Sequence, residues 1–216
     1  KLVKYTHSGK VSGDEAKGVG YGAGLVTQGG GPAAPRGLSQ ELQQELLALA
    51  RGSIWNRLKK KSMEPPLSPY VELNQPAAVF VTLEKDGALR GCIGTMTPRQ
   101  LLSDAVAAYA AASAFEDTRF GPLSAGELAS VKIEISVLSP LRRVGSWEEV
   151  VEGKHGVYVQ KGRLSGTYLP QVWEHFKSRE EFLTSLCLEK AGLDAGGWKE
   201  KSTALYVYTV DSFKEK

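Results

Sequence analysis

Hydrophobic and polar residues alternate most regularly over residues 130–139, SVKIEISVLS. Successive side chains of an extended strand point to opposite faces, so residues two apart share a face. The apolar members are Val131, Ile133, Ile135 and Val137, and the polar members are Lys132, Glu134 and Ser136. The pattern predicts a strand with one face on a hydrophobic core and with Glu134 on the other face.

Three other stretches show helical periodicity. Leucine and alanine recur every three or four residues over 38–58, which predicts a helix that begins after the N-cap Ser39. Thr97, Pro98 and Gln100 have the spacing of a capping box with proline at the first helical position, and predict a second helix through about 114. A third helix is expected over 178–191, before the stop signal of Gly192.

Short turn signals between apolar runs predict hairpins. The runs 78–84 and 88–95 flank the tripeptide KDG, and residues 156–170 are expected to turn at Lys161–Gly162. Residues 204–213 are expected to form a last strand. Hairpins with interspersed helices favour an α+β fold with a mainly antiparallel sheet and flanking helices.

Composition excludes several classes of protein. The 216 residues carry a formal net charge of +3, too small to indicate a nucleic-acid-binding protein, and no apolar run approaches the roughly 20 residues of a membrane span. The two cysteines are far apart and form neither a disulfide framework nor a CxxC pair, so a closed zinc site has no support. We therefore predict a cytoplasmic protein without a metal site.

The stretch GALRGCIGT, residues 87–95, is the strongest candidate for chemistry. Strict alternation would place Arg90 and Cys92 on one strand face, where a guanidinium would lower the pKa of the thiol and favour the reactive thiolate. Gly91 and Gly94 would leave space around the sulfur for a ligand or for another backbone segment. The alternative is a buried structural cysteine beside a β-bulge.

Other polar residues could complete such a site. Asp117 and Arg119 could orient a substrate or tie down their own loop. If the sheet is covered on both faces, Glu134 would need a partner, with Arg90 or Arg119 as the candidates. His155 stands before a predicted strand and could act as a general base for a thiol, or could be a turn residue. Cys187 is expected in the core of the last helix; Lys190, near the helix end, could reach a site.

Several motifs then point to a family. LRGCIGT, AAYAAASAFEDTRFGPLSAGEL, IEISVLS, GKHGVYV, YLPQVW and LCLEKAGL, in this order and spacing, resemble the AMMECR1 domain family over about residues 38–213. The resemblance implies an α+β fold of two subdomains but no defined reaction or cofactor. It puts Arg90, Gly91, Cys92 and Gly94 in the presumed site. The other polar residues in matching motifs are Asp117, Arg119, Glu134, His155, Gln171 and Lys190.

The first residues carry a second resemblance. Residues 1–28 are similar to the C-terminal end of a Memo-like domain, which is related to LigB-type extradiol dioxygenases, and 29–37, rich in glycine and proline, are typical of a linker. Residues 38–216 would then be the AMMECR1 domain of a longer bacterial fusion. The AMMECR1 resemblance implies association with Memo-like and radical-SAM proteins.

Two hypotheses remain open at the level of the sequence. In the first, the protein is a cysteine-dependent enzyme for a small anionic substrate, with Cys92 as nucleophile or substrate-holding thiol. Arg119 and Lys190 would bind the anion, while Glu134 or His155 moves a proton. In the second, it is a non-catalytic binding or scaffold domain in which Cys92 is structural.

Overall fold

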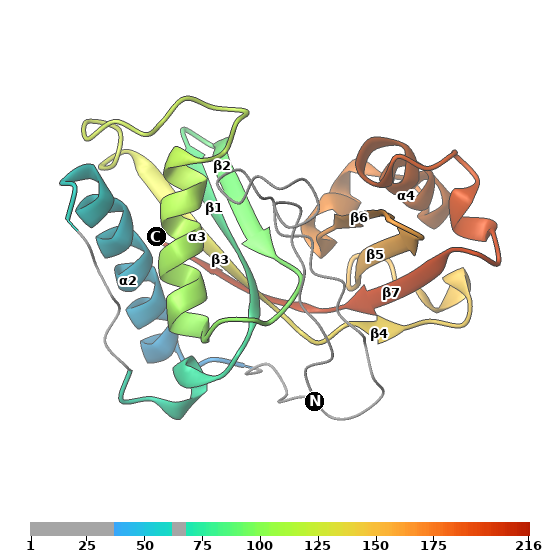
Figure 1. The fold of residues 1–216 in the computed structure, drawn as a ribbon, viewed down its shortest axis with the longest axis horizontal. Coiled ribbons are helices and arrows are strands. Elements are labelled where there is room, and N and C mark those ends of the chain that lie inside the picture. The colour runs from blue at the N-terminus through green and yellow to red at the C-terminus, as the bar shows by residue number, and fades with distance from the viewer. Residues whose placement is uncertain (1–36, 62–67) are drawn as a thin grey trace, which may run out of the picture. The chain divides into compact units, whose positions relative to one another are not determined.

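The computed structural model describes residues 37–61 and 68–216. The predictions for 1–28 and for all but the last residue of 29–37 concern residues outside these ranges. The described chain forms two four-stranded sheets, in the orders β2-β1-β3-β8 and β4-β7-β5-β6, and every strand pair is antiparallel (Figure 1). The predicted α+β class with antiparallel sheets and flanking helices is confirmed.

The first sheet carries the predicted alternating strand at its centre. Its strands are β1 (Ala78–Lys85), β2 (Ala88–Thr95), β3 (Val131–Leu138) and β8 (Val210–Lys214). The apolar face of β3 is buried against α2 (Gln40–Leu58) and α3 (Leu102–Phe115), which lie side by side on one face of the sheet (Figure 1). The opposite face carries the polar residues of β3, including Glu134.

The second sheet has its own core. It consists of β4 (Arg142–Arg143), β5 (Gly156–Lys161), β6 (Leu164–Tyr168) and β7 (Ala204–Tyr208). Buried valines and leucines of β5 and β7 pack with α4 (Arg179–Ser185) and the π-helix that continues it, Leu186–Ala191. The 3₁₀-helices are Val71–Asn74, Trp147–Glu149, Pro170–His175 and Gly197–Lys199.

One predicted strand proves to be two. Residues 204–213 divide at Thr209 into β7, in the second sheet, and β8, in the first. Ser139, between β3 and β4, pairs with Thr209 in both directions, through bonds of 2.9 Å from each backbone N–H. The chain therefore crosses between the sheets twice, and the two crossings are hydrogen-bonded to each other. The hydrophobic pattern of residues 204–213 could not reveal that its two halves join different sheets.

The helix boundaries agree with the sequence in part. Ser39 caps α2 as predicted, since its hydroxyl accepts from the backbone N–H of Leu42. The predicted capping box before α3 is wrong, because that helix begins only after Leu101, which makes no side-chain cap. The third predicted helix is confirmed through its stop at Gly192, which has a left-handed backbone with φ of 66°. Its second half is a π-helix, which periodicity does not distinguish.

Candidate functional site

A β-bulge interrupts the signature strand at Arg90. Gly91 of β2 lies opposite Leu83 and Leu89 lies opposite Glu84, so Arg90 is the extra residue of the bulged strand. A bulge breaks the two-residue alternation on which the sequence prediction depended. Cys92 lies opposite Thr82, on the face away from the helices. The prediction that Arg90 and Cys92 are neighbours on one face is therefore wrong.

Arg90 instead joins β2 to the segment after α3. Its Nε donates to Glu127 at 3.2 Å, and its Nη2 donates to the carbonyl of Gly121 at 2.9 Å. The hydrogen bond from Arg90 is the main reason why the pKa of Glu127 falls to about 2. Only 14% of the Arg90 side chain is exposed. This geometry gives Arg90 a structural contact, rather than the expected one with the thiol.

The spaces beside the signature glycines are filled by the protein. A Cβ atom on Gly91 would lie 2.1 Å from the carbonyl oxygen of Ser113 in α3, and one on Gly94 would lie 2.3 Å from the carbonyl oxygen of Val79. The Phe80 side chain also comes within 2.5 Å of the latter position. The sequence suggested two uses for these glycines. The close approach of another backbone segment is confirmed, whereas there is no open space at their Cβ positions.

Asp117 and Arg119 hold the backbone of Cys92 at the sheet edge. Asp117 Oδ2 accepts from the Cys92 N–H at 2.9 Å, and Arg119 Nη2 donates to the Cys92 carbonyl at 3.3 Å. The two side chains are also paired with each other at 2.7 Å, and this contact chiefly lowers the pKa of Asp117. Because β2 is the edge strand of the described sheet, these outward groups have no strand partner among the described residues. Asp117 thus bonds to Arg119 in its own loop, as one of the two alternatives from the sequence has it, and it also bonds to the signature.

Ser113 was not predicted to matter. Its hydroxyl accepts from the Ile93 N–H at 2.8 Å and donates to the Val81 carbonyl at 2.7 Å. Ile93 and Val81 lie opposite each other in the β2–β1 pair, so a side chain of α3 bridges two groups of the sheet ladder. The only sequence signal was a hydroxyl residue within an alanine-rich helix. We call residues 113–119, which carry Ser113, Asp117 and Arg119, the clamp segment.

The Cys92 thiol is partly buried, and burial raises its pKa above the ordinary value. The Thr82 hydroxyl, 3.3 Å from the sulfur, and the charge of Arg119 act in the opposite direction, whereas Asp117 and Glu134 reinforce the rise. The thiol is therefore protonated at neutral pH. The predicted lowering of its pKa by Arg90 is wrong, because the bulge takes that cation to Glu127.

Glu134 and Gln171 do come together. Thr82 pairs with Cys92 on one side and with Glu134 on the other, so these residues form one row across the sheet. Gln171, from the 3₁₀-helix of the second sheet region, donates through Nε2 to Ser212 at 2.8 Å and to Glu134 and Ser136 at 3.3 Å. The partner of Glu134 is thus Gln171 and neither of the two arginines that the sequence suggested.

His155 and Lys190 belong to the second sheet region. Nδ1 of His155 accepts from the Val151 N–H at 3.0 Å, and its carbonyl accepts from the Trp173 indole at 2.7 Å. Burial lowers the pKa of the imidazole. Lys190 is exposed, with Nζ 5.8 Å from the centre of the Tyr168 ring. The contacts of His155 hold a turn, and that of Lys190 holds a helix end. Neither residue contacts Cys92 or Glu134 through these interactions.

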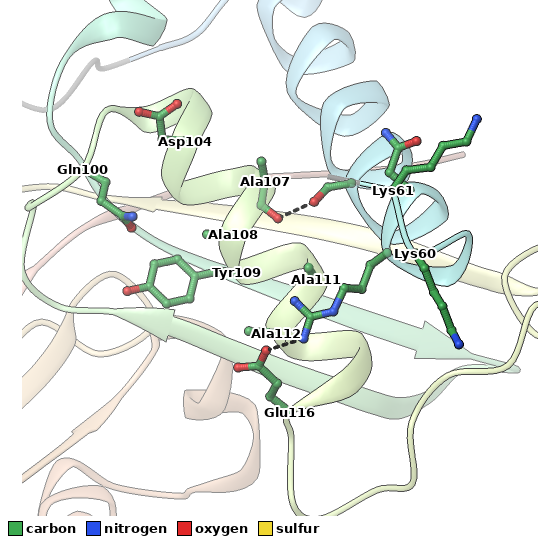
Figure 2. Close-up of a pocket in the computed structure, with 13 residues that line it drawn as sticks. Lys60, Lys61, Gln100, Asp104, Ala107, Ala108, Tyr109, Ala111, Ala112 and Glu116 are labelled. Carbon is green, nitrogen blue, oxygen red and sulfur yellow. Dashed lines mark hydrogen bonds and ion pairs between the residues drawn. The ribbon is translucent and has the colours of Figure 1, made fainter. Parts of the chain in front are cut away.

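A hollow of the described surface lies elsewhere, on the outer side of α2 and α3 (Figure 2). We call it the helix groove; its volume is about 1140 Å³. Its floor is formed by Ala107, Ala108, Ala111 and Ala112. Arg57 and Glu116 form an ion pair of 3.2 Å across it. Glu116, the C-cap residue of α3, lines the groove and directly precedes Asp117, which accepts from the Cys92 N–H.

The described residues contain no group of three or more His, Cys, Asp or Glu side chains that could hold a metal ion. Within the same ranges, no helix is long and apolar enough to cross a membrane.

The protonated Cys92 thiol, beside a hydroxyl and a carboxylate, can donate and accept hydrogen bonds. It is not prepared for nucleophilic attack at neutral pH.

Known proteins resemble the chain over most of its length. Protein PH0010 of Pyrococcus horikoshii is 37% identical over 195 residues, which cover 83% of this chain and 92% of that protein. Protein MK0488 of Methanopyrus kandleri is 38% identical, with 83% and 91% covered. The crystal structure of the uncharacterized protein PH0010 matches with a TM-score of 0.78 at 36% identity, over 83% of this chain and 94% of that one. The AMMECR1 family model matches residues 47–213, and the chain therefore belongs to the AMMECR1 family.

Proposed function

We propose that this protein is a non-catalytic binding domain, and that its signature, including Cys92, is structural. One observation carries the proposal: the protein itself uses the backbone groups of Cys92 and the spaces beside Gly91 and Gly94. A nucleophile needs a lowered pKa and an approach path for substrate, whereas burial raises the pKa of this thiol.

The partners proposed for this domain are a Memo-like protein and a radical-SAM protein, as the family resemblance implies, in the cytoplasm. Residues 1–28 are proposed as the end of a Memo-like domain, and 29–37 as its linker to the domain of 38–216.

The experiment measures binding of purified Memo-like and radical-SAM proteins from the same genome to the chain and to its Cys92→Ala variant. We expect at least one partner to bind, with the same Kd for both proteins. A Cys187→Ala variant controls for removing a buried thiol. Loss of binding, or of partner-dependent activity, in folded Cys92→Ala alone would overturn the structural role of Cys92. Absence of binding by the unaltered chain would overturn the binding role.

A second candidate is a cysteine-dependent enzyme acting on a small anion. It is favoured by Arg119, whose side chain is 51% exposed and whose charge lowers the pKa of Cys92 against the effect of burial. An anion site at Arg119 would raise the rate of alkylation by iodoacetate relative to neutral iodoacetamide. In a Cys187→Ala background, the binding-domain proposal expects slow labelling at pH 7 with no preference for the anion. A preference that disappears in Arg119→Gln would support the enzyme instead.

A further inference from the structure

The helix groove has a floor suited to close packing. Its four alanines have spacings of one, three and four residues along α3, so they share one side of that helix. Ala108 is exposed, and Ala111 and Ala112 are half-buried. Side chains of this size let the backbone of another helix approach α3 closely. The volume of the groove is slightly above the range of about 300–1,000 Å³ that is typical of small-molecule pockets.

The two ends of the groove carry opposite charge. α2 and α3 run in the same general direction, since Ser53 bonds to Ala107 and Arg57, one turn later, pairs with Glu116 (Figures 1 and 2). Their C-terminal ends therefore lie at one end of the groove, together with Lys60 and Lys61. Asp104, in the first turn of α3, lies toward the other end.

The cations at the C-terminal end of the groove are not paired with acidic residues in the part of the chain that the structure describes. Within the described ranges, neither Lys60 nor Lys61 makes an ion pair, and Asp104 makes none either. Lys60 has a left-handed backbone, with φ of 54°, and its N–H bonds to the carbonyl of Arg57 while that of Lys61 bonds to Asn56. Glycine is the usual residue at this position of a helix end. Here the position carries a cation that borders the groove.

We propose that the helix groove binds one amphipathic helix of a partner protein, antiparallel to α2 and α3, with acidic residues in its first turn and basic residues in its last. Its acidic N-terminal turn would meet Lys60 and Lys61, and its basic C-terminal turn would meet Asp104. The antiparallel direction also brings the positive end of its dipole to the negative ends of α2 and α3. A stripe of small apolar residues would face the alanine floor, as in other helix-in-groove complexes.

This inference rests on the proposed binding function and adds its location. The groove also borders the clamp segment: Ala112 and Glu116 line the groove, and their neighbours Ser113 and Asp117 hold Ile93 and Cys92. A partner helix in the groove would therefore contact the outer side of the same turn of α3 that supports the signature.

The test uses two fluorescein-labelled peptides of about 18 residues with identical composition and an alanine–leucine stripe. One has Glu in its first turn and Lys in its last, and the other has these charges exchanged. Both are hydrocarbon-stapled so that their helicity is equal. By fluorescence anisotropy, we expect the first peptide to bind the full chain at least about tenfold more tightly. Lys60→Glu/Lys61→Glu should reverse the preference, and Ala108→Glu should abolish binding of both.

A matched control replaces two exposed lysines of the second sheet region, Lys177→Glu/Lys201→Glu, and should leave both affinities unchanged. Equal affinity for the two peptides, no binding of either, or equal loss in the control variant would overturn the inference. If the Ala108→Glu chain, shown folded by circular dichroism, still binds its Memo-like or radical-SAM partner, the groove inference fails while the binding function stands. If the unaltered chain binds neither partner, the proposed function itself fails.

Discussion

Both sheets use a glycine on an edge strand to bring a helix close, but they do so differently. In the first sheet, Gly91 of β2 faces the Ser113 carbonyl, 2.1 Å from where a Cβ would be. In the second, Gly166 of β6 faces the backbone of Lys190 and Ala191, at 2.7 Å. Only α3 continues into a clamp segment that bonds to the strand backbone. The comparison indicates that the second contact is simple packing, whereas the first also fixes the hydrogen-bonding groups of a strand edge.

The largest effect is expected from Gly91→Ala. Its added methyl group would meet a backbone oxygen that cannot move without α3, so we expect a loss of about 3 kcal/mol or more in the free energy of unfolding by urea. Gly166→Ala should cost less, about 1–2 kcal/mol, because the contact is longer. Gly52→Ala in α2, where nothing lies within 4 Å of the new Cβ, is the control and should stabilise by about 0.5–1 kcal/mol. Equal losses of stability in Gly91→Ala and Gly166→Ala would show that the two glycine contacts do not differ as proposed.

Asp117→Ala should have the next largest effect, a loss of about 2–3 kcal/mol in the free energy of unfolding. The Cys92 N–H loses its charged hydrogen-bond acceptor in this variant. The pKa of Asp117 is lowered in the folded state, so its stabilisation is present above the unfolded value of about 3.9. It is lost as the pH falls below about 4, through the folded value. The urea midpoints of the unaltered chain and of Asp117→Ala should therefore converge in strong acid. A difference between them that stays constant with pH would show that the charge of Asp117 is not what stabilises the fold.

Ser113→Ala should cost about 1–3 kcal/mol, because the Ile93 N–H and the Val81 carbonyl both lose a partner. Hydrogen exchange distinguishes this from a general loss of packing. The Ile93 amide should exchange faster relative to other amides of β2, while amides of β5 in the second sheet should keep their relative protection. If the relative protection of the Ile93 amide were unchanged, β1 and β2 would have formed a direct hydrogen bond in place of the Ser113 bridge.

The smallest effect concerns the second sheet and a different pH range. The pKa of His155 is lowered in the folded state by burial, so the unfolded chain protonates first as the pH falls below about 6.5. Stability should therefore decrease from pH 6.5 down to the folded pKa and then level off. His155→Gln should remove this part of the pH dependence without changing that of Asp117 below pH 4. If His155→Gln and Asp117→Ala changed the stability over the same pH range, the idea that these two residues titrate separately would be wrong.

Much of the fold follows from local patterns, and much of the site does not. The alternation over 130–139 placed Glu134 on the correct face of β3, and turn residues located both hairpins correctly. Arg90 was misplaced because a bulge is decided by pairing with another strand, which alternation within one strand cannot report. Glu127 and Ser113, which hold Arg90 and Ile93, lie 37 and 20 residues away, and nothing local marks them as partners.

The Ser113 bridge also has a kinetic consequence. The turn between β1 and β2, Asp86–Gly87, has positive φ at both residues and favours early hairpin formation. Yet the native bond from Ile93 requires a hydroxyl from α3, so the hairpin cannot reach its final hydrogen bonding before the helix docks. Hairpin and helix should therefore mature in one cooperative step, and Ser113→Ala should change the folding rate as well as the unfolding rate. In this family member, the signature strand completes its folding together with its neighbouring helix.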